Sequence, residues 1–202
     1  MVYGEVLPVA AEKARLRRKF NGQWRALAPD NLAAGARQAM SHLARRPFWR
    51  QARTVMAYFA LPGELPTALL IRCARLAQKR VALPRTVDGG LEARAAGGFG
   101  SLVRGSYGIW EPHPDLTSPV AVEDLDLIIV PSLAFDERGV RLGRGGGHYD
   151  RFLQQVDRRR TVVAGWTLAA FVVPQLPREP HDQRVDWLIT ETGAIQIPPA
   201  PP

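Results

Sequence analysis

Residues 125–130 read Leu-Asp-Leu-Ile-Ile-Val, and five of the six are leucine or β-branched aliphatic residues. A run of this length and composition is typical of a buried β-strand that is covered on both faces of its sheet. Other short apolar runs, separated by stretches with helical spacing, lie at residues 54–59, 81–83, 161–166 and 185–190. Strands that alternate with helices predict an α/β fold with a mainly parallel sheet.

The helical stretches are predicted at residues 11–26, 29–45, 66–78 and 148–156. The first of them is basic and places Leu16, Phe20 and Trp24 on one face, because these residues are spaced four apart. The second and third begin at a proline, which is common in the first turn of a helix.

Regular structure is predicted to be interrupted at two places. Pro84 is expected to end the strand at residues 81–83, and residues 107–114 are expected to form an irregular loop. No repeat or linker divides the chain, so residues 1–202 are predicted to form one domain with a disordered proline-rich tail at about 198–202.

The composition is that of an ordinary soluble globular protein, with 46% hydrophobic and 23% charged residues among 202. The single cysteine, Cys73, excludes an intrachain disulfide and a cysteine-based zinc site, and it suits a reducing compartment. Residues 1–20 lack the apolar segment of a signal peptide, and no apolar run reaches the roughly 18 residues of a membrane helix. We therefore expect a soluble cytoplasmic protein.

The formal net charge of +8 favours a polyanionic partner. Nucleic acid, a nucleoside triphosphate and a polyglutamylated small molecule all fit this description. A basic surface that is only solvated fits equally well, so the charge alone leaves these alternatives open.

The most informative segment is Arg141-Leu-Gly-Arg-Gly-Gly-Gly-His-Tyr-Asp150, in which four of the five residues from Gly143 to Gly147 are glycine. Glycines directly before a helix allow backbone N–H groups to point together at an anion, aided by the helix dipole. Arg141 and Arg144 add charged donors that suit phosphate oxygens. The alternative is a hairpin loop that needs glycine for its geometry alone.

Spacing excludes two common phosphate-binding motifs. A P-loop requires Gly-Lys-Ser/Thr before its helix, whereas Gly147 is followed by His148. The dinucleotide fingerprint requires a third glycine at position 148. Asp150, just past the glycines, is placed to hold a Mg²⁺ that also bridges phosphates, although the dipole alone would favour a carboxylate at a helix start.

The segment from Val130 to Leu153 resembles the signature of the 5-formyltetrahydrofolate cyclo-ligase family. One block would be weak evidence, but six blocks in order, between about residue 11 and residue 193, are specific. The five further blocks are Lys13-x-x-x-Arg17, Tyr58-Phe-Ala-Leu-Pro-Gly-Glu64, Ala82-Leu-Pro-Arg85, Gly108-Ile-Trp-Glu-Pro112, and Leu176 to Asp186 followed by Ile189-Thr-Glu191.

The resemblance implies a three-layer α/β fold like that of the ribose-5-phosphate isomerase and CoA-transferase group. It also implies an ATP- and Mg²⁺-dependent ligase of one-carbon metabolism that converts 5-formyltetrahydrofolate to 5,10-methenyltetrahydrofolate and releases ADP and phosphate. In this reaction ATP phosphorylates the formyl oxygen, N10 attacks the activated carbon, and phosphate leaves as the ring closes. Such a transfer needs an amide cradle, cations and a metal, but no serine or cysteine nucleophile.

By position, the resemblance assigns ATP contacts to Lys13 and Arg17 and to the loop residues Arg141, Leu142, Gly143, Arg144, Gly145, Gly146, Gly147, His148 and Tyr149. Among these, Arg144, His148 and Tyr149 are expected to be catalytic. Asp150 and Asp182 are expected to bind Mg²⁺. For Lys13 and Arg17 the alternative is an exposed basic helix face.

The folate is expected to contact Phe59, Glu64, Tyr107 and Trp110, as well as Arg144, Gly145, Gly146, Gly147 and His148. The assignment of Glu64 rests on the resemblance, because a lone glutamate in a turn is usually solvated. Tyr107 and Trp110 are able to stack on flat rings, but single aromatic residues more often have a packing role.

Two residues depart from the family pattern: His148 occupies the position of a usual aromatic residue, and Gly146 that of a lysine found in some members. A non-catalytic or RNA-associated paralogue is the competing interpretation, and it predicts the loss of Asp150 or Asp182. Both aspartates are present. We therefore expect a monomeric enzyme whose partners are ATP and 5-formyltetrahydrofolate, with or without a polyglutamate tail, and neither nucleic acid nor a membrane.

Overall fold

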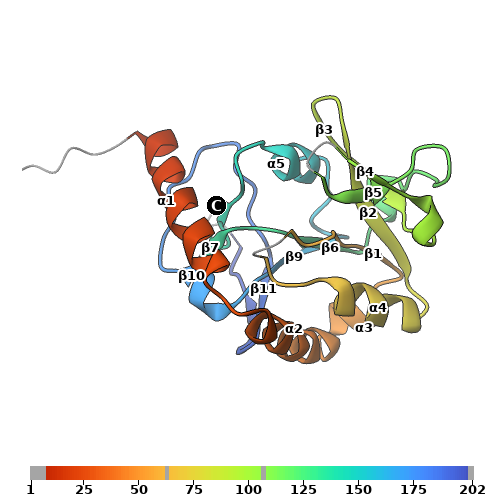
Figure 1. The fold of residues 1–202 in the computed structure, drawn as a ribbon, viewed down its shortest axis with the longest axis horizontal. Coiled ribbons are helices and arrows are strands. Elements are labelled where there is room, and N and C mark those ends of the chain that lie inside the picture. The colour runs from red at the N-terminus through yellow and green to blue at the C-terminus, as the bar shows by residue number, and fades with distance from the viewer. Residues whose placement is uncertain (1–7, 62–63, 106–107, 200–202) are drawn as a thin grey trace, which may run out of the picture.

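A seven-stranded sheet forms the centre of the computed structural model, which describes residues 8–61, 64–105 and 108–199 (Figure 1). Its strands are β1 (Thr54–Met56), β2 (Arg80–Val87), β3 (Gly90–Ala95), β6 (Leu127–Val130), β9 (Val162–Trp166), β11 (Trp187–Thr190) and β12 (Gly193–Gln196). The strand order is β12-β11-β9-β6-β1-β2-β3, and all neighbours from β11 to β2 are parallel. β3 and β12 are antiparallel edge strands. The predicted mainly parallel sheet is confirmed.

The predicted buried strand lies in the middle of this sheet. All four residues of β6 have 0% exposure, and β1 and β9 pair with the strand from either side. Asp126, just before β6, holds β1 in place because its carboxylate accepts hydrogen bonds from the backbone N–H groups of Arg53 and Thr54 at 2.7 and 2.8 Å.

Helices cover both faces of the sheet, as the predicted three-layer arrangement requires. One face carries α2 (Pro29–Ala44), α3 (Pro47–Gln51) and α4 (Ala68–Leu76), and the other carries α5 (His148–Leu153) (Figure 1). Alternate side chains of β6 enter separate apolar clusters on the two faces, since successive residues of a strand point in opposite directions.

The helix α1 (Val9–Arg25) lies beside a small sheet of β7 (Ala134–Asp136), β8 (Arg141–Leu142) and β10 (Val172–Val173) (Figure 1). Trp24 fixes this contact: its ring stacks on Phe171 with centroids 3.8 Å apart, and its indole N–H donates to the carbonyl of Leu133 at 2.9 Å. The predicted apolar face of the helix is confirmed at Phe20 and Trp24, which are both buried. α1 is thereby positioned next to the loop that follows β8.

The prediction that a strand stops at Pro84 is wrong, because β2 continues to Val87. The backbone groups of Arg80 and Ala82 form hydrogen bonds on the β1 side of β2. Every second residue of a strand directs its backbone groups to the same side, so the backbone nitrogen of Pro84 also points to the β1 side. β1 pairs only as far as Ala82. The missing N–H of Pro84 therefore removes no hydrogen bond from the sheet.

The prediction of an irregular loop at residues 107–114 is also wrong in part. Within it, β5 (Trp110–Pro112) pairs antiparallel with β4 (Leu102–Arg104). Strands of three residues have too little periodicity to be recognised in a sequence. Tyr107 lies outside the described residues. Short 3₁₀ turns complete the fold at Phe99–Ser101, Val122–Asp124 and Ala169–Phe171.

Within the described ranges, no helix combines the length and apolar character needed to cross a membrane. Most of the predicted proline-rich tail, residues 200–202, lies outside those ranges. The two tail residues before it, Pro198 and Pro199, have no regular secondary structure.

Candidate active site

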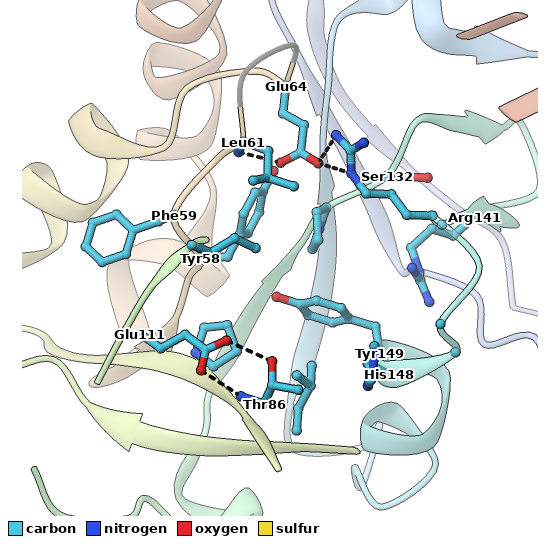
Figure 2. Close-up of a pocket in the computed structure, with 18 of the residues that line it drawn as sticks. Tyr58, Phe59, Leu61, Glu64, Thr86, Glu111, Ser132, Arg141, His148 and Tyr149 are labelled. Carbon is cyan, nitrogen blue, oxygen red and sulfur yellow. Dashed lines mark hydrogen bonds and ion pairs between the residues drawn. The ribbon is translucent and has the colours of Figure 1, made fainter. Parts of the chain in front are cut away.

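A cavity of about 260 Å³ lies beyond the carboxyl ends of β1 and β6 (Figure 2). Tyr58 and Phe59 follow β1 into its wall, and Pro131 and Ser132 follow β6. Ligands commonly bind at this edge of an α/β sheet, because the loops that follow parallel strands meet there. The wall is mainly apolar, and the polar side chains in it include Glu64, Thr86, Glu111, Ser132, Arg141, Arg144 and His148.

The glycine loop, residues 143–147, connects β8 to α5 and borders the cavity. Gly145 has a φ of +112° and Gly147 a φ of +65°, which are conformations that L side chains rarely adopt. None of the five backbone N–H groups in this loop donates a hydrogen bond to another described residue. These donors are therefore available to an anionic ligand.

Arg17 fastens the glycine loop to α1. Its Nε donates to the carbonyl of Gly143 at 2.9 Å. Its guanidinium carbon also lies 3.5 Å from the position of a Cβ built on Gly145. Arg17 is thus beside the loop, where the resemblance assigned it, and its contact with a nucleotide remains a prediction.

Arg144 and Glu64 join the glycine loop to the segment that follows β1. Nε and Nη2 of Arg144 donate to one oxygen of Glu64 at 3.0 and 2.8 Å, and the other oxygen accepts from the backbone N–H of Leu61 at 3.0 Å. The Glu64 side chain is only 7% exposed. A solvated turn glutamate, the alternative for this residue, is therefore excluded.

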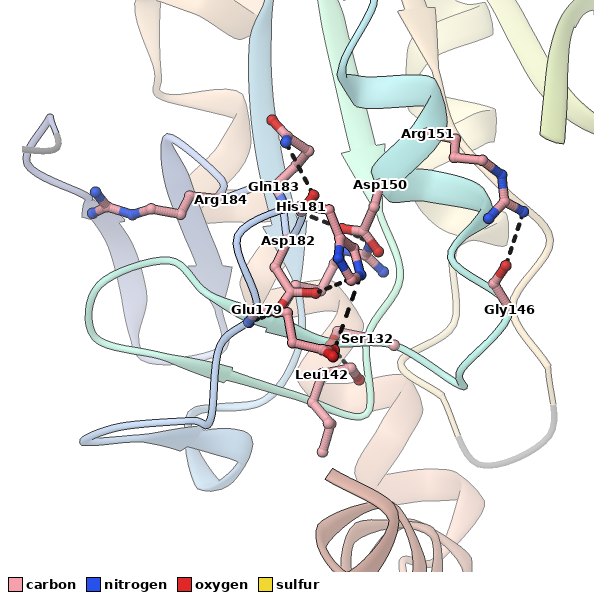
Figure 3. Close-up of polar contacts among 12 residues, drawn as sticks. Ser132, Leu142, Gly146, Asp150, Arg151, Glu179, His181, Asp182, Gln183 and Arg184 are labelled. Atoms are coloured by element: carbon pink, nitrogen blue, oxygen red, sulfur yellow. Dashed lines mark hydrogen bonds and ion pairs between the residues drawn. The ribbon is translucent and has the colours of Figure 1, made fainter. Parts of the chain in front are cut away.

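Asp150 forms an ion pair with Arg141, with Nη2 and Oδ1 separated by 2.8 Å. The same oxygen accepts a hydrogen bond from the backbone N–H of Gln183 at 3.1 Å. The side chains of Arg141 and Asp150 are 5% and 14% exposed. Asp150 is more than a carboxylate at a helix start, because it connects α5 and β8, which flank the glycine loop, to the segment around Asp182 (Figure 3).

Tyr149 directs its hydroxyl group toward the cavity (Figure 2). This hydroxyl is buried and has no hydrogen-bond partner among the described residues. Burial raises the pKa of Tyr149, with Arg141 opposing the shift and Glu64 adding to it, so the hydroxyl keeps its proton at neutral pH. A buried donor of this kind is stabilised when a ligand supplies the acceptor.

Lys13 lies among carboxylates and is buried, at 5% exposure, so the exposed helix face is excluded for this residue. Its Nζ is 2.6 Å from Oδ2 of Asp182 and 2.7 Å from Oε2 of Glu179. Burial raises the pKa of Asp182, but the N–H of Glu179 and the ammonium of Lys13 outweigh this effect, and the pKa is lowered. Glu179, His181 and Asp182 each offer a ligand atom, and these atoms lie within 4.8 Å of one another (Figure 3).

Replacing Lys13 with methionine is expected to lower the free energy of unfolding by about 3 kcal/mol at neutral pH, because two carboxylates lose a buried cation. The folded pKa of Asp182 lies below its ordinary value of 3.8, so the pair stabilises the fold above that pH and loses this effect as the pH falls through the folded pKa. Urea unfolding at neutral and acidic pH should show a difference that shrinks in acid. Lys19→Met, an exposed lysine of the same helix, is the control. Equal stability of both variants would contradict the buried pair.

Three other predicted residues have distinct environments. Leu142 is 1% exposed and belongs to the apolar core, so only its backbone can approach a nucleotide. Phe59 lines the cavity, and its contact with the folate stays a prediction. Trp110 also lines it but is 44% exposed, and the guanidinium carbon of Arg104 lies 4.2 Å from its ring centroid.

The two departures from the family pattern are neighbours in space. A Cβ built on Gly146 would lie 2.6 Å from Cδ2 of His148. The imidazole ring therefore occupies the space in which a side chain at position 146 would begin. His148 lines the cavity, and its Nδ1 lies 3.4 Å from Nη2 of Arg151.

Some polar residues of the cavity wall were not predicted from the sequence. Ser132 is buried, and its Oγ lies 2.6 and 2.8 Å from the carbonyl oxygens of Ala134 and Leu142, either of which can accept its one hydrogen. Glu111 is buried on β5 and accepts hydrogen bonds from Thr86. The block Gly108-Ile-Trp-Glu-Pro112 contained Glu111, but nothing in its spacing distinguished a buried carboxylate from a solvated one.

Comparison with known proteins supports the resemblance over most of the chain. Residues 9–191 match the family described as the 5-formyltetrahydrofolate cyclo-ligase family. The chain is 34% identical over 174 residues to the 5-formyltetrahydrofolate cyclo-ligase of Escherichia coli (strain K12), covering 82% of this chain and 93% of that protein. It is 28% identical over 202 residues to the probable 5-formyltetrahydrofolate cyclo-ligase of Schizosaccharomyces pombe, covering 93% and 99% of the two chains.

Two solved structures have a similar fold. The NMR structure of the 5,10-methenyltetrahydrofolate synthetase of Aquifex aeolicus superposes with a TM-score of 0.80 at 29% identity, covering 94% of this chain and 95% of that one. The synthetase of Mycoplasma pneumoniae gives 0.72 at 18% identity, covering 89% and 99%, and supports the fold alone. The chain therefore belongs to the 5-formyltetrahydrofolate cyclo-ligase family.

Proposed function

We propose that this protein is a 5-formyltetrahydrofolate cyclo-ligase, which uses ATP to convert 5-formyltetrahydrofolate to 5,10-methenyltetrahydrofolate. Its family and the named activity of its relatives support this reaction. The observation that carries the proposal is the position of the glycine loop, which borders an apolar cavity and is followed by α5, where Asp150 contacts the segment of the carboxylate cluster around Asp182. The cavity suits a pterin ring, and the loop with its neighbouring charges suits a triphosphate.

The reaction needs activation of a poor electrophile. Transfer of the γ-phosphoryl group of ATP to the formyl oxygen turns that oxygen into a good leaving group and releases ADP. N10 of the folate then attacks the formyl carbon and loses its proton, and phosphate departs with the former formyl oxygen. The chain's own contribution is to position the two substrates and to neutralise charge on the transferred group.

The triphosphate is proposed to bind the N–H groups of residues 143–147, with Arg17, Arg141 and Arg144 as further donors. Arg17 is already held against the loop by the carbonyl of Gly143, and the side chain of Arg144, within the loop, is held by Glu64. A charged donor that is fixed before the ligand arrives loses less entropy on binding. Lys13, which is buried against Asp182, would act on the phosphates near the metal.

The residues present fit a Mg²⁺ ion at Asp150 and Asp182. Magnesium binds carboxylate oxygens together with phosphate oxygens and water. Each aspartate uses one oxygen for its ion pair, and the second oxygen of Asp182 lies 3.8 Å from Nε2 of His181. The backbone N–H of Gln183 brings Asp150 beside the residue that follows Asp182. When bound, the ion would offset the negative charge of the phosphoryl groups.

The folate is proposed to enter the cavity between Phe59, Glu64 and the glycine loop. Tyr149 would donate its hydroxyl hydrogen to the substrate, since this group is buried, protonated and without another acceptor. Arg144 would face both the folate and the triphosphate, because it belongs to the loop and also lines the cavity. We propose that the enzyme works as a cytoplasmic monomer on these small molecules rather than on nucleic acid.

The test is the formation of product. Purified protein mixed with ATP, Mg²⁺ and 5-formyltetrahydrofolate should develop the absorbance band of the methenyl product, with one phosphate released for each molecule formed. The Escherichia coli relative serves as the positive control. Absence of the band from folded protein, under conditions in which the relative is active, would favour the non-catalytic or RNA-associated interpretation.

A further inference from the structure

Glu111 is a second buried carboxylate in the cavity wall, in addition to Glu64. It comes from β5, is 5% exposed, and faces the cavity from a different side than Glu64 (Figure 2). A Cβ built on Gly105 would lie 2.2 Å from its carboxyl carbon, so the absence of a side chain at position 105 leaves room for this group.

The hydrogen bonds of Glu111 within the described residues are all with Thr86. One oxygen accepts from the hydroxyl of Thr86 at 2.8 Å, and the other accepts from the backbone N–H of Thr86 at 3.2 Å. Glu111 forms no ion pair with any residue in the described part of the chain, whereas Glu64 is paired with Arg144. A buried carboxylate without a cation is unfavourable unless further donors reach it.

A carboxylate offers about four acceptor positions, and Thr86 occupies two of those on Glu111. No other described residue donates to these oxygens, so each retains an acceptor position for a ligand. Two adjacent N–H donors of a planar ring match a carboxylate in a bidentate arrangement. The pterin ring of the substrate carries such a pair, the 2-amino group and N3–H.

We propose that Glu111 binds the 2-amino and N3–H groups of the pterin and so sets the orientation of the ring in the cavity. This inference rests on the proposed function. Phe59 and Leu91, on the wall, supply apolar surface for the faces of the ring. Glu64 then has a separate task, because its pairing with Arg144 fixes the position of a loop arginine.

A purely structural role for Glu111 would be to link β5 to β2 through Thr86. Glutamine at position 111 retains an oxygen for that link but loses the charge and one acceptor. The structural role predicts an effect on stability alone. Recognition of the pterin predicts an effect on folate binding that depends on the donors of the ring.

Glu111→Gln is expected to weaken the binding of 5-formyltetrahydrofolate by about 10- to 100-fold, measured by calorimetry without ATP, and to leave the affinity for Mg²⁺-ATP unchanged. Glu123→Gln, the same change at an exposed glutamate, is the matched control and should bind like the wild type. Wild-type folate affinity in a folded Glu111→Gln protein would overturn the assignment.

A substrate analogue that lacks the 2-amino group tests the contact from the ligand side. The wild type should bind 2-desamino-5-formyltetrahydrofolate about 10- to 100-fold more weakly than the substrate, and Glu111→Gln should lose most of this discrimination. If the variant does not fold, the wild type alone decides, since equal affinity for substrate and analogue overturns the inference. A wild type that makes no methenyl product would overturn the proposed function itself, which is a different result.

Discussion

Replacing Asp150 with asparagine is expected to lower kcat by about 10³-fold, because a metal that offsets phosphoryl charge contributes several kcal/mol to the transition state. Asparagine keeps an oxygen that accepts from the N–H of Gln183 and lies beside the Arg141 guanidinium, the two contacts that hold Asp150 in place. Initial rates of methenyl formation over a range of Mg²⁺ concentrations measure the effect. The decrease in kcat should persist at saturating concentrations of ATP and 5-formyltetrahydrofolate.

Asp157→Asn is the matched control for Asp150. Asp157 lies just after α5, is exposed, and pairs with Arg159 on the surface. An exposed ion pair of this kind contributes little, so turnover and the melting temperature should stay close to those of the wild type. Wild-type turnover in Asp150→Asn would show that the metal does not depend on this carboxylate.

Replacing Gly145 with alanine is expected to lower kcat/KM for ATP by about 10²-fold, because misplaced backbone donors stabilise the transferred phosphoryl group less well. The φ of +112° at Gly145 is strained for any L side chain. The nearest atom of Arg17 would lie 3.5 Å from the added Cβ, which is an ordinary contact. The loss should therefore come from a changed loop conformation rather than from a clash.

Gly22→Ala provides the control for the glycine loop. Gly22 lies within α1, and a Cβ built there meets no atom within 4 Å. Alanine in a helix is favoured over glycine by about 1 kcal/mol, so this variant should be as active as the wild type and slightly more stable. Equal ATP kinetics for Gly145→Ala and Gly22→Ala would mean that the loop geometry is not needed for the nucleotide.

The sequence predicted those parts of the fold that depend on local patterns. The apolar run before Val130 identified the central strand, and the spacing of Phe20 and Trp24 identified the buried face of α1. The continuation of β2 through Pro84 was not predictable, because it depends on where the neighbouring strand ends. The pairing of β4 with β5 was not predicted either, because strands of three residues have no recognisable pattern and depend on contacts between distant parts of the chain.

In the candidate site, too, the residues that are close in the chain were predicted, and the contacts between distant residues were not. Its glycines and Asp150 are close together in the chain, so the glycine loop was visible in the sequence. The ion pair of Lys13 with Asp182 joins residues 169 positions apart, and a basic helix gave no sign that one of its lysines is buried. The hydrogen bonds of Glu111 with Thr86 likewise join β5 to β2, and they became evident only from the structure.

Amide hydrogen exchange measures whether the backbone N–H groups of the glycine loop bind the phosphates of the nucleotide. In the free protein the N–H groups of residues 143–147 have no acceptor among the described residues and should exchange rapidly. With Mg²⁺ and a non-hydrolysable ATP analogue bound, these amides should exchange far more slowly, because phosphate oxygens accept their hydrogen bonds. Exchange at an unchanged rate in the nucleotide-saturated protein would contradict the account.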